Sequence, residues 1–130
     1  MDLVIDANIF LAVALNEPEN NQIIKLTAGA RLIAPEVLLY EIGNALSAMI
    51  KRQRLTFQQA TKVFSIIELI PVLLEKSDIM QALNISHNFN TYAYDAYYLE
   101  VAHRLRIPLM TLDQKMKNIG NSLNINLLEI

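Results

Sequence analysis

Four acidic residues lie in otherwise apolar stretches of the sequence and are the side chains best suited to chemistry. A carboxylate taken out of water is costly unless a cation or hydrogen bonds compensate it. Three of the four segments contain no nearby Lys or Arg that could serve as that cation. The pattern therefore predicts a divalent metal site held by Asp6, Glu41, Asp95 and Asp113.

The types of donor indicate which metal and which reaction to expect. The chain has no Cys, and its two His, His87 and His103, lie on different predicted segments, so a zinc site is not expected. Carboxylate oxygens suit Mg²⁺ or Mn²⁺. Such ions generate hydroxide, neutralise a phosphate and stabilise a leaving oxygen. The expected reaction is metal-assisted hydrolysis of a phosphodiester.

The elements that must position these acids alternate along the chain. Short apolar runs predict strands, and longer runs with helical periodicity predict helices between them. The alternation predicts an α/β fold of three layers, α/β/α, with a parallel sheet covered on both faces, in a single domain of residues 1–130. Strands are expected at residues 2–6, 31–34, 72–74, 109–112 and 125–128, and helices at about 8–15, 20–28, 35–52, 56–69, 77–88, 91–106 and 113–118.

Several residue types mark where these helices begin. Pro35 suits a first helical turn, and Ser77 is expected to cap its helix. Thr56 and Gln59 have the spacing of a capping box. Gly43 costs roughly 1 kcal/mol against Ala in mid-helix, which indicates close packing beside Glu41.

The parallel sheet explains how acids far apart in the sequence would meet. Ligands of such sheets bind beyond the carboxyl ends of the strands. Asp6 ends the first strand and Asp113 follows the fourth, while Glu41 and Asp95 lie near the N-termini of helices that start at the same edge. Helical spacing places both helix acids on inward stripes, which are Val37, Glu41, Ala45 and Ala48, and Tyr92, Asp95, Ala96, Leu99 and Ala102.

Each polar residue by itself also has a structural interpretation. Asp6 and Asp113 could cap the helices that follow them, and Asp95 could complement a helix dipole. Asn8 could cap a helix or hydrogen-bond a ligand water, and Thr111 could fill a strand or orient a carboxylate. Capping does not require all four acids at one edge, so their joint pattern favours the metal site.

The ordered set of motifs resembles the PIN-domain ribonucleases. Val4–Asn8 resembles their opening motif, and Pro35 followed by Glu41–Leu46 is similar to their helix with the second acid. Tyr94–Leu99 and Thr111–Asp113 resemble the third and fourth motifs. The resemblance covers nearly the whole chain, and within this group the chain looks like the VapC toxins of type II toxin–antitoxin modules.

The resemblance implies a five-stranded sheet ordered 3-2-1-4-5 and an endoribonuclease that depends on Mg²⁺ or Mn²⁺ and cleaves single-stranded or structured RNA. It also implies a homodimer and a neutralising VapB-like antitoxin that inserts a segment into the active-site groove. The chain departs from some relatives by having Lys115 and Lys117 where they carry a further acid. The implied site residues are Asp6, Glu41, Asp95 and Asp113 as metal ligands or their support, with Asn8 and Thr111 as polar helpers.

The basic and aromatic residues have mostly structural interpretations. Arg104 is spaced to pair with Glu100 at i,i+4. Lys115 and Lys117, beside Asp113, are candidates for contacts to RNA phosphates. Four tyrosines surround Asp95 and are interpreted mainly as packing residues. Cations that end helices complement helix C-termini, and this accounts for Lys51, Arg52, Arg54 and Arg106.

Composition and competing families narrow the function further. No apolar run is long enough to span a bilayer, so a soluble cytoplasmic protein without a membrane partner is expected. The 53% hydrophobic content favours a homodimer that covers apolar surface. The chain lacks the acids and the Lys that a receiver domain requires, and it has Asn8 where a haloacid-dehalogenase-like phosphatase requires a second Asp. The remaining alternative is a non-catalytic PIN-like module that binds RNA or protein.

Overall fold

In the computed structural model, which describes residues 1–130, the strands form one parallel sheet of order β3-β2-β1-β4. Val4 pairs with Ile33 on one side and with Leu109 on the other, so β1 is central. The strands are β1 (Asp2–Ile5), β2 (Arg31–Pro35), β3 (Leu73–Glu75) and β4 (Leu109–Met110), and the helices are α1 (Ala7–Ala14), α2 (Asn20–Thr27), α3 (Leu38–Lys51), α4 (Phe57–Glu68), α5 (Ile79–Phe89), α6 (Ala93–Leu105) and α7 (Gln114–Ser122).

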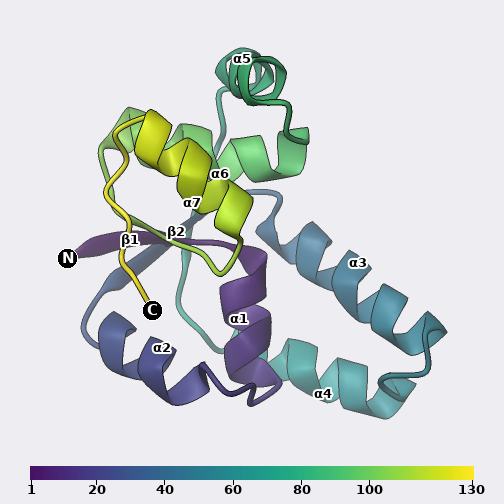
Figure 1. Cartoon of the computed structure of the whole chain (residues 1–130). Coiled ribbons are helices and arrows are strands. Elements are labelled where there is room, and N and C mark those ends of the chain that lie inside the picture. The colour runs from purple at the N-terminus through teal and green to yellow at the C-terminus, as the bar shows by residue number, and fades with distance from the viewer.

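Helices cover both faces of the sheet (Figure 1). In this view α1, α2 and α4 lie below β1 and β2, and α5, α6 and α7 lie above them. Leu3 and Val4 of β1 are fully buried between the two layers, as are Leu99 of α6 and Leu109 of β4. Burial of each such side chain contributes about 1.5–3 kcal/mol, which explains why the buried residues of β1, Leu3–Ile5, are apolar. The three-layer α/β/α fold with a parallel sheet is confirmed.

The predicted sheet order is confirmed for its first four strands, and the fifth strand is reduced to a bridge. Leu127 forms an isolated parallel bridge with Leu109. Leu109 N donates to Asn126 O, and Leu128 N donates to Leu109 O, both at 2.9 Å. The last segment therefore lies beside β4 at the predicted position. It is short because α7 extends to Ser122, beyond the predicted end at residue 118.

Two predicted helix starts are wrong. Pro35 is the last residue of β2, and α3 begins three residues later at Leu38. Proline has no N–H to donate, and here the next residue supplies the bond to β3, since Glu36 N donates to Glu75 O at 3.0 Å. Asp78, and not Ser77, caps α5, because its side chain accepts a hydrogen bond from Gln81 N at 3.2 Å. By contrast, the capping box of Thr56 and Gln59 is confirmed at the start of α4.

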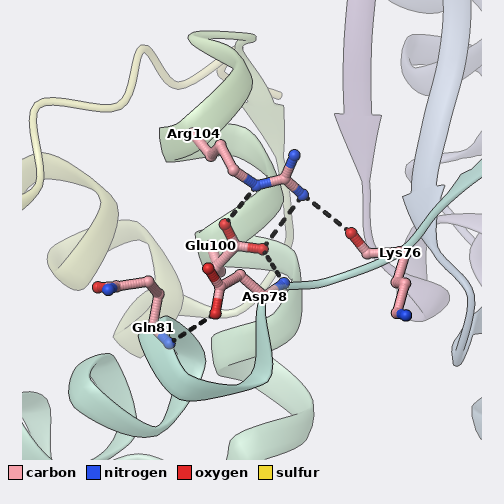
Figure 2. A network of polar contacts seen from close by, with 5 residues as sticks. All are labelled: Lys76, Asp78, Gln81, Glu100 and Arg104. Carbon is pink, nitrogen blue, oxygen red and sulfur yellow. Dashed lines mark hydrogen bonds and ion pairs between the residues drawn. The ribbon is translucent and has the colours of Figure 1, made fainter.

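A polar network around the buried Glu100 and the exposed Arg104 links α6 to the start of α5 (Figure 2). Arg104 Nε donates to Glu100 Oε2 at 2.8 Å, as the i,i+4 spacing predicted. Glu100 Oε1 also accepts from Asp78 N at 2.8 Å, and Arg104 donates to the Lys76 carbonyl at 2.9 Å. This network holds the segment before α5 against α6 on the upper face of the sheet.

The longest helix, α3 with 14 residues, is shorter than the roughly 20 residues that a bilayer span needs, and none of the helices qualifies as a membrane span.

Candidate active site

A cavity of about 280 Å³ opens beyond the carboxyl end of β1, between α1, α3 and α6. Three of the four predicted acids line it, namely Asp6, Glu41 and Asp95. Each comes from a different element, because β1 ends at this edge while α3 and α6 begin there. The parallel arrangement thus brings together carboxylates that are more than thirty residues apart in the sequence.

Asp6 is buried at the junction of β1 and α1, with 4% of its surface exposed. It caps α1 through a hydrogen bond from Ile9 N to Oδ1 at 3.2 Å. Its other oxygen, Oδ2, accepts a hydrogen bond from the Thr111 hydroxyl. Burial raises the pKa of Asp6 to about 6, although the bonds from Thr111 and Ile9 oppose this rise. The capping interpretation is therefore correct, and Asp6 also lines the cavity, while its role as a metal ligand stays a prediction.

Glu41 lies near the start of α3 and has a buried oxygen, Oε1, without a hydrogen-bond partner. The hydroxyl of Tyr98 lies beside it, and that oxygen is also buried and unpartnered. Burial raises the pKa of Glu41 to about 7; the charges of Asp95 and Asp6 add to the rise, and the Tyr98 hydroxyl opposes it. An unsatisfied buried carboxylate costs free energy that a bound cation would recover.

Asp95 lies in the first turn of α6 and completes the acidic lining of the cavity. Burial raises the pKa of this carboxyl, and the charge of Asp113 raises it further. The Thr91 hydroxyl and the Lys115 charge act in the opposite direction. These effects indicate that Asp113 and Lys115 lie within electrostatic reach of Asp95.

Asp113 lies outside the cavity lining and caps α7, with Met116 N donating to its Oδ1 at 2.9 Å. Its backbone N donates to the Thr111 hydroxyl oxygen at 3.0 Å. Since the same hydroxyl donates to Asp6, Thr111 connects the ends of β1 and β4. The structure thus places Asp113 and Thr111 behind the acids that line the cavity.

The other predicted polar residues lie at different distances from the acids of the cavity. Asn8 is exposed and lines the cavity, while Asp6 provides the cap of α1. Lys115 donates to the Asn90 carbonyl, and its charge reaches Asp95. Lys117 pairs instead with Glu129 at 3.4 Å. Only Lys115 of the two lysines is therefore placed to act near the acids.

Several lining residues were missed or misplaced by the sequence interpretation. Tyr98 and Asn44 line the cavity, each three residues after an acid on the same helix, and that spacing could have identified them. Tyr92, expected to face inward, is 85% exposed because α6 begins after it. Gly43 is exposed, with nothing within 4 Å of a Cβ added there, so the prediction of close packing at this residue is wrong.

The donor set at the cavity fits a hard divalent cation. All three acidic side chains offer carboxylate oxygens, and none of them takes part in an ion pair. Glu41 Oε1 is a buried acceptor without a donor. No three acidic or histidine side chains lie close enough together here to hold one ion. A shared ion therefore requires the carboxylates to rotate toward one another.

Comparison with known families decides what kind of domain this is. The family model described as PIN domain matches residues 3–121. The chain belongs to the PIN domain family. No curated protein matches it in sequence. Family membership agrees with the four motifs and with the three-layer fold around β1.

Crystal structures of other PIN-domain proteins have the same fold. PAE2754 from Pyrobaculum aerophilum is 21% identical, with a TM-score of 0.77, over 99% of this chain and 89% of that one. VapBC2 from Rickettsia felis, bound to a DNA fragment from its promoter, is 16% identical, with a TM-score of 0.68, over 99% and 98% of the two chains. VapC20 from Mycobacterium tuberculosis, described as a sarcin–ricin loop cleaving toxin, is 13% identical, with a TM-score of 0.65, over 91% and 95%.

Proposed function

We propose that this PIN domain is an endoribonuclease that depends on Mg²⁺ or Mn²⁺. The observation that carries the proposal is the cavity at the carboxyl end of β1, where three carboxylates from separate elements are buried or half-buried without an ion pair. A bound divalent ion would supply a hydroxide and neutralise phosphate charge. Asp6, Glu41 and Asp95 are the residues that would hold it.

The surrounding residues give this site its geometry and charge. Thr111 and Ile9 N each bond one oxygen of Asp6, so this carboxylate is fixed in orientation. Glu41 and Asp95 are less buried than Asp6. The negative charge of Asp113 disfavours ionisation of Asp95, which a bound cation would offset, and Asn8 is placed to bond a ligand water or a phosphate oxygen. Because the pKa of Glu41 is raised to about 7, cation binding near neutral pH would release a proton.

We further propose that the enzyme acts as a VapC-like toxin with a VapB-like antitoxin partner and an RNA substrate. Solved relatives of similar fold include VapBC-1 from nontypeable Haemophilus influenzae, at 16% identity with a TM-score of 0.66. The exposed apolar residues Ile79, Met80 and Leu83 on α5 support a homodimer, since exposed apolar patches mark association sites. Light scattering that shows a monomer at tens of micromolar protein would count against the dimer.

The decisive experiment compares RNA cleavage with Mn²⁺ and with EDTA, using wild type beside Asp6→Asn. We expect cleavage only by wild type and only with Mn²⁺. A thermal-shift series with Mn²⁺ and no RNA supplies a second readout, in which wild type is stabilised and Asp6→Asn is not. Equal cleavage by carefully purified wild type and variant would defeat the nuclease proposal.

One observation favours the alternative of a non-catalytic PIN-like module. The acids line one cavity, yet no three of them are spaced to hold a single ion. A non-catalytic module would show neither Mn²⁺-dependent cleavage nor a Mn²⁺-dependent thermal shift. The same pair of measurements therefore separates the two functions.

A further inference from the structure

The helical hairpin of α3 and α4 carries an uneven share of the positive charge. Residues 42–67 contain no Asp or Glu and four cations, in a chain whose net charge is −2. The cations are Lys51, Arg52, Arg54 and Lys62. Three of them lie within four residues of one another at the turn between the helices, here called the hairpin tip (residues 51–54).

The cations of the hairpin tip are not engaged within the protein. Lys51, Arg52 and Arg54 are exposed and form no ion pair or side-chain hydrogen bond. Elsewhere, Arg31 and Arg104 are each paired with an acid. A favourable interaction with the helix dipole accounts for Lys51 in the last turn of α3, but Arg54 lies beyond that turn.

An exposed face of α3 connects the acidic cavity to the hairpin tip. Tyr40, Asn44, Ser47 and Lys51 are spaced i, i+4, i+7 and i+11, so they share one side of the helix, and all four are exposed. Tyr40 and Asn44 also line the cavity. From Glu41 to Lys51 the rise along the helix is about 15 Å. Figure 1 shows α3 extending away from the sheet toward its turn into α4.

The chemistry of this face suits a nucleic-acid strand that leaves the cavity. Asn44 and Ser47 are neutral and polar, and open space surrounds Gly43 beside them, so a phosphate backbone meets neither charge repulsion nor bulk. Tyr40 and Phe57, 80% and 65% exposed, lie at the cavity and at the start of α4, where a base could stack on them. The acidic cavity itself attracts no phosphate without a cation, so attraction must come from elsewhere on the surface.

We infer that the exposed face of α3 and the hairpin tip form the docking surface for the RNA strand next to the scissile phosphate. The inference rests on the proposed ribonuclease function and adds to it where the substrate lies. Lys51 and Arg54 bind phosphates a few nucleotides from the cleaved bond, and Tyr40 contacts the nucleotide at the cavity. An acidic protein segment would use the same cations but has no need of the exposed aromatic side chains.

The test measures binding of a fluorescein-labelled, mixed-sequence single-stranded 30-nucleotide RNA by anisotropy across a salt series. All proteins carry Asp95→Asn and are assayed with Mg²⁺, so that the probe stays intact. Lys51→Gln with Arg54→Gln is compared with Lys25→Gln with Arg106→Gln, which removes one exposed lysine and one exposed arginine elsewhere. For the tip variant we expect Kd to rise roughly tenfold and the log–log salt slope to fall by about 1.4, since each single-strand phosphate contact contributes about 0.7. The control should match the parent.

Other results overturn the inference in distinguishable ways. Equal affinity and salt slope in the tip variant and the parent would show that RNA does not bind this surface. If an acidic peptide binds the parent but not the tip variant, the tip is assigned to a protein partner instead. RNA binding by the parent that is weak and equal in all variants would also overturn it. If the wild-type chain binds RNA but does not cut it with Mn²⁺, the nuclease proposal fails while the docking surface is still judged by the binding comparison.

Discussion

Two regions of this protein bury carboxylates, and they compensate the charge in opposite ways. Glu100, 3% exposed, accepts hydrogen bonds from Arg104 and from the Asp78 amide, so its oxygens are satisfied (Figure 2). Asp6, Glu41 and Asp95 form no ion pair, and Glu41 Oε1 has no donor in hydrogen-bond geometry, although the Tyr98 hydroxyl lies beside this side chain. The two regions therefore differ in whether a cation inside the protein pairs with the buried carboxylate, and the metal-site proposal rests on that difference.

The largest expected difference between the two regions is in activity. Asp95→Asn should lower Mn²⁺-dependent RNA cleavage by at least about 100-fold, because one ligand of the metal is lost. Glu100→Gln should retain cleavage, since this carboxylate acts within the α5–α6 network. Initial rates at saturating RNA measure both. Loss of cleavage in a folded Glu100→Gln protein would break the distinction between the two regions.

The next effect concerns stability, and here the Glu100 variant should show the clear loss. Glu100→Gln weakens a buried charge-assisted network and is expected to lower the free energy of unfolding by about 2–3 kcal/mol. Asp2→Asn is a matched control, because it removes the partner of Arg31 in an exposed ion pair worth about 0–1 kcal/mol. Urea unfolding of both variants compares them, and equal losses would show that burial does not strengthen the Glu100 network.

The uncompensated site should make stability depend on pH when metal is removed. The pKa of Glu41 is raised to about 7 from an ordinary value of 4.5, so the folded protein holds this proton more tightly and loses stability as pH rises through that interval. In EDTA at pH 8, Glu41→Gln should therefore be more stable than wild type by about 1–3 kcal/mol, and the difference should fall below about 1 kcal/mol near pH 5. Added Mn²⁺ should reverse the order. Thermal unfolding at both pH values measures this, and an unchanged difference would contradict it.

The smallest effect tests the unpartnered hydroxyl at the cavity. Tyr98→Phe removes a buried oxygen that lies beside Glu41 but makes no hydrogen bond of normal geometry, so the expected change in unfolding free energy in EDTA is within about 0.5 kcal/mol. Thr111→Val should cost about 1–2 kcal/mol, because its hydroxyl bonds both Asp6 and the Asp113 amide. Equal costs, measured by urea unfolding, would indicate that the Tyr98 hydroxyl is satisfied in solution.

Local sequence signals predicted most elements. The predictions were wrong where the same residue type is compatible with two kinds of local structure. The capping box of Thr56 and Gln59 specified the start of α4, because both hydrogen bonds are made within one turn. Pro35 was misassigned because proline suits a strand end as well as a helix start. The segment at 125–128 was expected as a strand, but its pairing depends on where α7 ends, which is a tertiary matter.

The sequence by itself determined the three-layer fold and the four acids, because hydrophobic periodicity and buried charge are properties of residue order. Only the tertiary structure decided which of those acids line the cavity and which lies outside it. Asp6, Glu41 and Asp95 line the cavity, whereas Asp113 caps α7 behind it. It also decided that Tyr98 faces the site while Tyr92 faces solvent, since the first turn of α6 starts one residue after Tyr92. Such choices depend on which side of each helix packs on the sheet, and residue spacing alone does not specify that rotation.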